Sequence, residues 1–529
     1  MSEIARRNVL SKVALGNIPP DTVITNGVLF DAFTREFIER QSIWIKDGMI
    51  AYVGPDSDPA RGGKTEVVDA DRMVLLPGLI DGQTHPFSSR SGVEEFIKHV
   101  IPSGVTTAVI EADEYAPFAG DDGVESMTRG LEGQPIRFYY TPSSLCRLRG
   151  SDEELFLKDL GLGKIGWTPK RRVQAGTKFD AFCCDGAMTP KEAVERLRLG
   201  DSVMVREGGA RRELEGVKKI FERKIDFRRF MLATGGVDPE GFLTEGYLDA
   251  SLRRALKLGV SPRLAYQMVT INVAEYFRLD HLIGSLSPGR VADIVTIPSP
   301  EMFSPQWVMC GGRMIFRDGV SLAEPRKVFF SDHMFNTIRI PEFTLPLLPE
   351  KGKVRSMELV TRFVTQEKII DLENPEERKG VIMILALDRL GSGKSFMGVL
   401  KNFGLQKGAY GTTMSQETTD LIAAGCDNES METVIGRLKE IGGGGVYALG
   451  KEIVAEFPAP LCGVVSLKPM AIVNEEVKRL EAVMRQNGVA WEKPVLTFDT
   501  LGTPAFPHLR ITHRGYFTSR SREILSLEI

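Results

Sequence analysis

Residues 77–86 read PGLIDGQTHP and follow an apolar run at residues 73–76. An apolar segment that leads into Pro-Gly and then an aspartate is typical of a barrel strand that presents side chains to a metal ion. Side chains alternate along a strand, so positions 83 and 85 are expected to point the same way. Where a metal site would use two histidines, this chain has Gln83 and His85. The stretch therefore predicts a metal-dependent hydrolase whose metal site is altered.

The composition is that of an ordinary globular protein. With 529 residues, the chain is long enough for two to four domains. A net charge of -3 gives no reason to expect nucleic acid or a membrane as partner. The apolar stretches are too short to span a bilayer, and no apolar run follows Arg6 and Arg7 as in a signal peptide. Six cysteines in so long a chain indicate no disulfide framework, so we expect a cytoplasmic protein.

Two separated segments have the pattern of short antiparallel strands. The first spans residues 1–72, with apolar runs at 22–26, 42–46, 50–53 and 66–69. The second spans residues 285–335, with runs at 289–295 and 312–316. The simplest arrangement is one composite β domain built from both flanks of the central region.

The central region, residues 73–284, alternates short apolar strands with helical patterns. Such alternation predicts a parallel sheet, and the length suits a (β/α) barrel. The predicted helices lie at 94–101, 190–199, 244–258 and 262–277. The seven predicted strands, one fewer than a complete barrel needs, lie at 73–80, 106–111, 137–141, 164–167, 179–183, 202–206 and 229–233.

Residues 336–529 begin a different pattern after the Pro-containing segment 340–346. Predicted strands at 380–387, 446–449 and 453–456 alternate with a helix at 431–441, and four glycines at 442–445 form a turn. This predicts a separate α+β domain. The segment GSGKS at 391–395 ends like a phosphate-binding loop, but Asp388 stands where that loop needs its first glycine, so we do not expect a nucleoside triphosphate there.

The order of these regions and their motifs resembles the adenine deaminase family of the amidohydrolase superfamily over nearly the whole chain. The first matching segment is Pro77 to Asp81 followed by His85. The others are IPSGVTT at 101–107, DEYA at 113–116, PSS at 142–144, TPKEA at 189–193 with REG at 206–208, PGRVADI at 288–294, and the glycine-rich signals at 403–409 and 458–463. The fold expected from this resemblance is an amidohydrolase-type α/β barrel with the composite β domain and a C-terminal α+β domain.

The resemblance implies a hydrolase that converts adenine to hypoxanthine and ammonia with a divalent manganese, iron or zinc ion. It implies His85 and Glu114 as metal ligands, and Arg206 and Glu207 as substrate-binding residues. It further implies a small-molecule substrate, adenine, and a homo-oligomer. The residues alone leave other readings open: His85 as an interior hydrogen-bonded histidine, Glu114 as a partner of a buried arginine, and Arg206 and Glu207 as a structural ion pair.

The chain departs from the family at positions that carry the family's metal-binding and catalytic residues. Gln83 replaces a histidine, Asp113 another, and Tyr247 stands in place of the histidine of a Glu-Gly-His motif. The family's Asp-His-Glu becomes CDG at 184–186, its Thr-Asp-Asp becomes TGG at 234–236, and its His-Asp-Ser-His becomes QETT at 416–419. Only residues 168–178 stand where the family carries several tens of residues, so one βα unit is expected to be missing there.

Two hypotheses follow from this combination. In the first, the chain is a hydrolase of the adenine deaminase type with a reduced metal site; in the second, it is a catalytically inactive purine-binding or scaffold relative. No residue is assigned as catalytic. We expect His85 and Glu114 to lie near each other at the C-terminal mouth of the barrel, with Gly235, Asp185 and Tyr247 around the same cavity.

Overall fold

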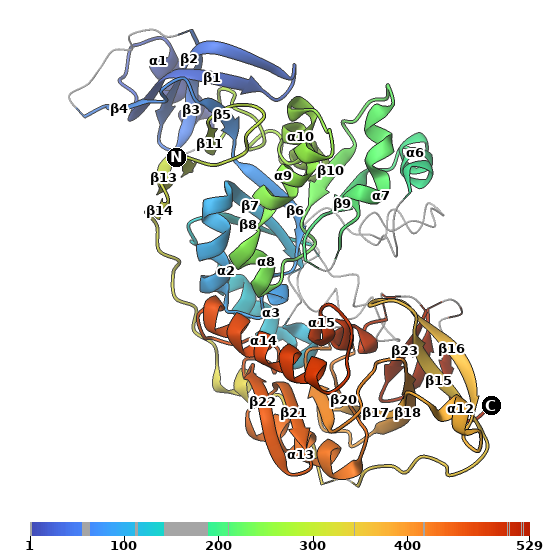
Figure 1. The fold of residues 1–529 in the computed structure, drawn as a ribbon. Coiled ribbons are helices and arrows are strands. Elements are labelled where there is room, and N and C mark those ends of the chain that lie inside the picture. Colours follow the sequence, from blue (N-terminus) through green and yellow to red (C-terminus); the bar gives the residue numbers. More distant parts are fainter. Residues whose placement is uncertain are drawn as a thin grey trace.

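The computed structural model describes residues 3–529 except 56–63, 112–114, 142–188 and the positions 210, 343, 416–417, 505, 507, 520 and 522. Within the described residues, three regions follow one another in space. A β sheet built from both flanks of the central region stands at one end, the barrel strands and their helices lie in the middle, and the C-terminal sheets form the other end (Figure 1). None of the helices in this described part is both long and apolar enough to cross a membrane.

The first sheet joins the two flanks as predicted. Its strands come from β1 (Thr22–Asp31), β2 (Glu36–Lys46), β3 (Met49–Pro55), β4 (Glu66–Asp69) and β5 (Val74–Pro77) on one side and from β11 (Ile294–Ile297), β12 (Trp307–Cys310), β13 (Arg313–Arg317) and β14 (Val320–Ser321) on the other. The flanks meet where β5 runs parallel to β1 and antiparallel to β11. Helix α1 (Glu3–Ala14) packs against this sheet through Leu10 and Val13.

One sequence prediction is wrong at this junction. Residues 73–80 were expected to be a single barrel strand, but they divide into β5 of the composite sheet and the start of β6 (Leu79–Thr84) of the barrel. The division falls at Gly78, where an added Cβ would lie 2.2 Å from Oγ1 of Thr106 and 2.9 Å from Cβ of Asp293. Only glycine fits so close an approach, so the chain passes from one sheet to the other there, beyond the predicted limit at residue 72.

The barrel region contains two groups of parallel strands. The first is β6, β7 (Val105–Glu111) and β8 (Arg137–Thr141), and the second is β9 (Val203–Arg206) with β10 (Phe230–Ala233). The groups adjoin because the N–H of Gly235, just after β10, donates to the carbonyl of Gln83 in β6 at 2.9 Å. The predicted strands at 164–167 and 179–183, and the expected gap at 168–178, lie outside the described residues.

Helices surround these strands as the sequence predicts for a (β/α) arrangement (Figure 1). The predicted segment 262–277 is divided into two helices, α10 and α11, with Thr270 between them at non-helical dihedral angles. The helices are α2 (Val93–Val100), α3 (Ala116–Leu131), α6 (Pro190–Arg198), α7 (Leu214–Val217), α8 (Pro239–Thr244), α9 (Leu248–Lys257), α10 (Pro262–Met268) and α11 (Ile271–Phe277). Short 3₁₀ segments lie at Pro86–Ser89, Ile101–Ser103, Lys218–Glu222, Asp332–Phe335 and Thr500–Gly502.

The C-terminal region contains an eight-stranded sheet in the order β16-β15-β18-β17-β20-β19-β21-β22. Its strands are β15 (Lys353–Leu359), β16 (Thr365–Asp371), β17 (Val381–Asp388), β18 (Ser395–Lys401), β19 (Ala409–Thr412), β20 (Asp420–Gly425), β21 (Gly444–Leu449) and β22 (Glu452–Pro458). A smaller sheet contains β23 (Leu509–Thr512), β24 (Gly515–Thr518) and β25 (Glu523–Leu525). Helices α12 (Pro375–Arg378), α13 (Asn428–Glu440), α14 (Met470–Gln486) and α15 (Pro494–Asp499) complete the region.

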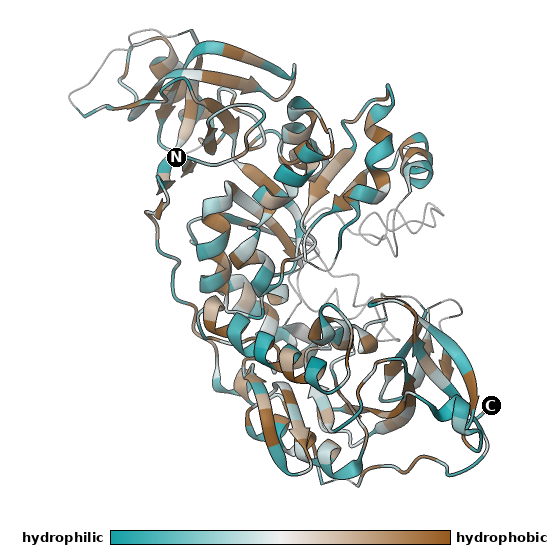
Figure 2. Ribbon diagram, viewed as in Figure 1, coloured by the Kyte–Doolittle hydropathy of each residue, from teal (hydrophilic) through white to brown (hydrophobic). Residues whose placement is uncertain are grey.

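Alternation along β21 places α13 and α14 on opposite faces of the large sheet. Val446 and Ala448 belong to the same apolar cluster as the buried residues of α13, whereas Tyr447 clusters with those of α14. Figure 2 shows the matching pattern, with hydrophobic residues on the strands and hydrophilic residues along the outer sides of the helices. Helix α14 therefore lies between the large sheet and the barrel (Figure 1).

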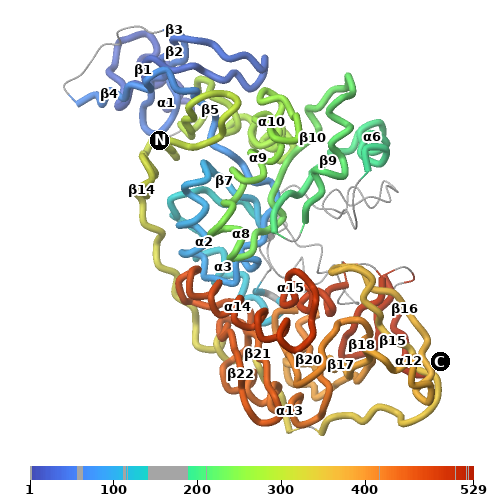
Figure 3. Tube along the Cα trace, viewed as in Figure 1, coloured from blue at the N-terminus to red at the C-terminus, as the bar shows by residue number. Residues whose placement is uncertain are grey.

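Buried polar contacts fix the C-terminal region against the barrel. Arg90 and Asp499 form an ion pair at 2.6 Å with both side chains almost fully buried, and the N–H of Met470 donates to Glu95 at 3.0 Å. The chain reaches this region through the segment after β14, which runs along the outside of the barrel (Figure 3). There the N–H of Val328 donates to Glu94 at 2.8 Å. These contacts place the C-terminal region against the helices of the barrel.

Candidate functional site: the barrel mouth

The barrel mouth is defined here as the C-terminal ends of β6, β9 and β10 and the residues that follow them. This is the end at which barrels of this type build their sites. At the end of β6, Gln83 is buried and His85 is half-buried. His85 precedes the 3₁₀ turn Pro86–Ser89, and its carbonyl accepts the N–H of Ser88 at 3.0 Å. Glu114 and Asp185 lie outside the described residues, so a His85–Glu114 metal pair stays a prediction.

A buried polar network ties β6 to β10 below His85. The hydroxyl of Thr234 donates to the carboxylate of Asp81 at 2.6 Å, and the N–H of Thr234 donates to it at 3.1 Å. The hydroxyl of Tyr247 donates to the hydroxyl of Thr84 at 2.8 Å. Burial raises the pKa of Asp81, against the opposite effect of the hydrogen bonds from Thr234 and Tyr247. Asp81 and Thr84 are fully buried, so the network joins β6 to β10 inside the barrel.

The two glycines after Thr234 take the left-handed backbone conformation, with φ of 63° at Gly235 and 98° at Gly236. An added Cβ at Gly235 would lie 3.0 Å from Cδ of Arg206. At Gly236 it would lie 2.4 Å from Oγ of Ser88 and 3.5 Å from Cβ of His85. The sequence prediction named Gly235, but Gly236 is the glycine whose Cβ position lies beside Ser88 and His85.

Arg206 and Glu207 both lie buried at the end of β9, but each is paired with a different partner. The Nε and Nη2 atoms of Arg206 donate to Oε1 of Glu213 at 3.1 and 2.6 Å. The N–H of Arg206 donates to the second oxygen of Glu213 at 2.9 Å. One carboxylate thus receives both the side chain and the backbone of Arg206.

Glu207 is held by a different set of partners. Its carboxylate accepts the N–H of Leu214 at 2.9 Å and lies 3.3 Å from Nε of Arg254 and 3.6 Å from Nη1 of Arg212. Burial raises the pKa of Glu207, and the N–H of Leu214 and the two arginines oppose that shift. Arg206 and Glu207 therefore form ion pairs with other residues and not with each other. Substrate binding by either residue stays a prediction.

The described residues of the barrel mouth supply few of the donors that a divalent metal ion needs. Among the described residues, no three His, Cys, Asp or Glu side chains are grouped so that they could hold one. Gln83 and Gly235 stand at two of the family's ligand positions, and neither supplies an anionic or imidazole donor. Asp81 is fully buried and hydrogen-bonded to Thr234.

Sequence reasoning missed Asp81, Glu213 and Thr234 as residues that organise this end of the barrel. Asp81 could have been found, because it precedes Gln83 by two positions and so shares its side of the strand. Thr234 lies 153 residues from Asp81, and no spacing rule reveals such a contact. Glu213 lies in the loop after β9, where nothing in its neighbours marks it as the partner of Arg206.

Comparison with known proteins gives matches along almost the whole chain. Family models match for the "Adenine deaminase C-terminal domain" at residues 358–523 and the "Amidohydrolase family" at residues 188–315. An adenine deaminase of Clostridium botulinum is 30% identical, over 98% of this chain and 97% of the relative. An adenine deaminase of Moorella thermoacetica is 29% identical, over 97% and 96%. A zinc-bound adenosine deaminase structure from Xanthomonas campestris has 13% identity and a TM-score of 0.41, over 57% of this chain and 94% of that chain.

Proposed function

Because this chain belongs to the adenine deaminase family of amidohydrolases, we propose that it binds a purine at the barrel mouth and deaminates adenine far more slowly than relatives with the full set of metal ligands. The proposal keeps adenine as the small-molecule ligand. It includes the expected cytoplasmic location and homo-oligomeric state.

One observation carries the proposal: the space beside Gly235 is filled by the side chain of Arg206. The family has an aspartate at this position, which binds metal and moves protons. Here the left-handed backbone disfavours any side chain, and a Cβ at this position would lie only 3.0 Å from Cδ of Arg206. Arg206 is itself held in place by Glu213. The loss of the aspartate is therefore built into the surrounding packing.

This chain has few of the residues that the metal chemistry of the family requires. A hydroxide nucleophile at neutral pH requires a bound ion that lowers the pKa of water from about 15.7 to about 7. His85 and Glu114 are the two candidate ligands that the sequence offers. One imidazole and one carboxylate leave most positions around a divalent ion to water, so an ion bound there should exchange readily.

Arg206 and Glu207 are assigned to the wall of the site. Arg206 gives Nε and Nη2 to the buried Glu213, and breaking a buried pair of this kind is strongly unfavourable. Glu207 would have to give up its ion pairs with the partly exposed Arg212 and Arg254. The same ion pairs favour the second candidate, a catalytically inactive relative that binds a purine. The two candidates differ only in whether ammonia is released.

The test is adenine binding and turnover on the full chain. Calorimetry should detect adenine binding, and ammonia release with added Mn²⁺, Fe²⁺ or Zn²⁺ should be at least about 100-fold slower than for the Clostridium botulinum adenine deaminase assayed beside it. Binding without any ammonia favours the inactive relative. Turnover as fast as that of the relative, or no adenine binding at all, would contradict the proposal.

A further inference from the structure

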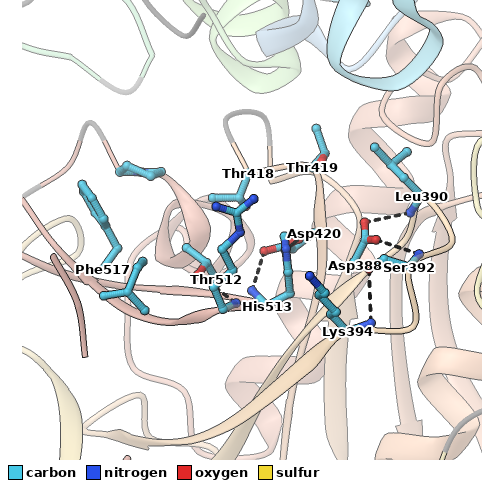
Figure 4. A pocket seen from close by; sticks show the side chains of 13 residues that line it. Asp388, Leu390, Ser392, Lys394, Thr418, Thr419, Asp420, Thr512, His513 and Phe517 are labelled. Carbon is cyan, nitrogen blue, oxygen red and sulfur yellow. Dashed lines mark hydrogen bonds and ion pairs between the residues drawn. The ribbon is translucent and has the colours of Figure 1, made fainter. Parts of the chain in front are cut away.

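A cavity of about 400 Å³ lies in the C-terminal region, and none of its lining residues belongs to the barrel mouth. It is formed by the turn between β17 and β18, the residues that lead into β20, and the turn between β23 and β24. Figure 4 shows Asp388 and Lys394 on one side, Asp420 and His513 near the centre, and Phe517 on the other side. The volume falls within the range of small-molecule sites.

The two carboxylates of the cavity are already satisfied. The two oxygens of Asp388 accept the N–H groups of Leu390 and Ser392 at 3.0 and 2.9 Å. Asp420 is fully buried, and its oxygens accept the N–H of His513 at 2.9 Å and lie 2.8 Å from ring Nδ1 of His513. Neither carboxylate needs a cationic ligand.

The GSGKS segment that resembled a phosphate-binding loop lies in this cavity's wall. It joins the antiparallel strands β17 and β18, and no helix follows it. Asp388 fills the turn by accepting its backbone N–H groups, so these groups cannot hold a phosphate. The turn instead brings the Lys394 side chain to the cavity.

The cationic groups of the cavity are not satisfied in the same way. Lys394 and Arg514 are both exposed. Within the described residues, neither the ammonium group of Lys394 nor the guanidinium group of Arg514 makes an ion pair or side-chain hydrogen bond; the hydrogen bonds of these two residues involve their backbones. Asp420 engages Nδ1 of His513, which leaves Nε2 of that ring for another partner. The hydrogen bond to Asp420 raises the pKa of His513, while partial burial lowers it.

The wall behind the cavity is fixed by a buried arginine. Nε of Arg389 donates to the carbonyl of Thr419, one of the lining residues, at 3.0 Å. The Arg389 side chain is fully buried, and its guanidinium carbon lies 4.2 Å from the ring centre of Phe118 in α3 of the barrel. The lining residue Thr419 therefore has a fixed position.

We propose that this cavity binds a small organic anion, with a phosphate or carboxylate group held by Lys394, Arg514 and His513 and an apolar body placed against Phe517 and Ile524. Lys394 and Arg514 offer only donors, and Nε2 of His513 becomes a donor when the ring is protonated. Phosphate and carboxylate oxygens accept such charge-assisted hydrogen bonds. A neutral purine has no negative charge with which Lys394 and Arg514 could form an ion pair. The ligand therefore differs in charge from the adenine of the barrel mouth.

The test is calorimetry on the full chain with three probes: inorganic phosphate, adenosine 5′-monophosphate and citrate. At least one should bind, and Lys394→Ala and Arg514→Ala should each weaken that binding about tenfold, the effect of one lost charge-assisted hydrogen bond. The matched control is Lys439→Ala, because Lys439 is exposed on α13 and lies outside the cavity. It should leave binding unchanged.

The probes also separate the possible sources of the anionic group. If inorganic phosphate and the monophosphate bind but citrate does not, the natural ligand carries a phosphate group. If only citrate binds, the ligand carries a carboxylate group. Adenine binding should be the same in wild type and Lys394→Ala, which separates this site from the barrel mouth. The proposal is overturned if none of the three probes binds, or if their binding is equally strong in Lys394→Ala and Arg514→Ala.

Discussion

The barrel mouth and the cavity of the C-terminal region both gather charged side chains, but they use them differently. In the barrel mouth, Arg206 is buried against Glu213 and Glu207 against Arg254. In the C-terminal cavity, Asp388 accepts backbone N–H groups of its own turn and Asp420 is bonded to His513. Lys394 and Arg514 have no side-chain partner within the described residues. The number of charged side chains near a site is therefore a poor guide to ligand binding. The hydrogen-bond donors that have no partner within the folded protein are a better guide.

Both regions also place a glycine-containing turn at the end of a strand. After β10, Gly235 and Gly236 bring the backbone against Arg206 and Ser88, which closes the space. After β17, Gly391 at φ 109° and Gly393 at φ 72° form an open turn whose Cβ positions have no atom closer than 3.4 Å. Similar local sequence therefore gives a closed wall in one region and an open one in the other.

Removing the partner of Arg206 should have the largest effect on stability. Glu213→Ala leaves a buried guanidinium without its carboxylate, and we expect the free energy of unfolding to fall by about 3–5 kcal/mol. The control is Glu125→Ala, which removes an exposed ion pair with Arg129 and should cost less than about 1 kcal/mol. Denaturant titration of both variants measures the difference. Equal, small losses would mean that Arg206 is not committed to Glu213 and is available to a ligand.

Restoring the family's aspartate at position 235 should be the next most costly change. Gly235→Asp forces a side chain into a left-handed backbone, at about 1–2 kcal/mol, and against Cδ of Arg206. The control is Gly319→Asp, because Gly319 has φ 83° and no atom within 4 Å of its Cβ position. The Gly235 variant should unfold at a lower denaturant concentration than the control and release no more ammonia from adenine than wild type. A gain in turnover at the stability of the control would show that the mouth can still accept the catalytic carboxylate.

Removing the ion pair of His513 with Asp420 should have the smallest effect on stability, and that effect should depend on pH. The folded-state pKa of His513 is raised, so its stabilisation is fully present below the unfolded value of about 6.5 and is lost as pH rises through the raised folded value. The difference in melting temperature between wild type and His513→Gln should therefore be larger at pH 6 than at pH 9. The exposed His281, changed to Gln, is the control. A difference that does not vary with pH would contradict a charged His513.

The sequence predicted much of the fold because apolar periodicity and turn residues are local signals. The strands at 137–141 and 66–69 and the helices α6 and α13 lie where they were expected. The strand at 73–80 was predicted wrongly because both of its halves are apolar. The break at Gly78 depends on how closely Thr106 and Asp293 approach, which no local pattern records.

The location of the candidate site was predictable from the sequence, but the residues that its side chains contact were not. The family motif indicated the end of β6 and the positions of Arg206 and Gly235. The contacts that decide their roles, Arg206 with Glu213 and Thr234 with Asp81, are set by how loops and neighbouring strands meet. The predicted pairing of His85 with Glu114 stays a prediction, because Glu114 lies outside the described residues.

The central claim is that the barrel mouth no longer holds a stable metal centre, and the most direct test is the metal content of the purified full chain. The protein should be produced with added manganese, dialysed, and analysed for manganese, iron and zinc beside its Clostridium botulinum relative. We predict well under one ion per chain, unchanged by His85→Ala. One or two tightly held ions per chain, lost on His85→Ala, would contradict the claim.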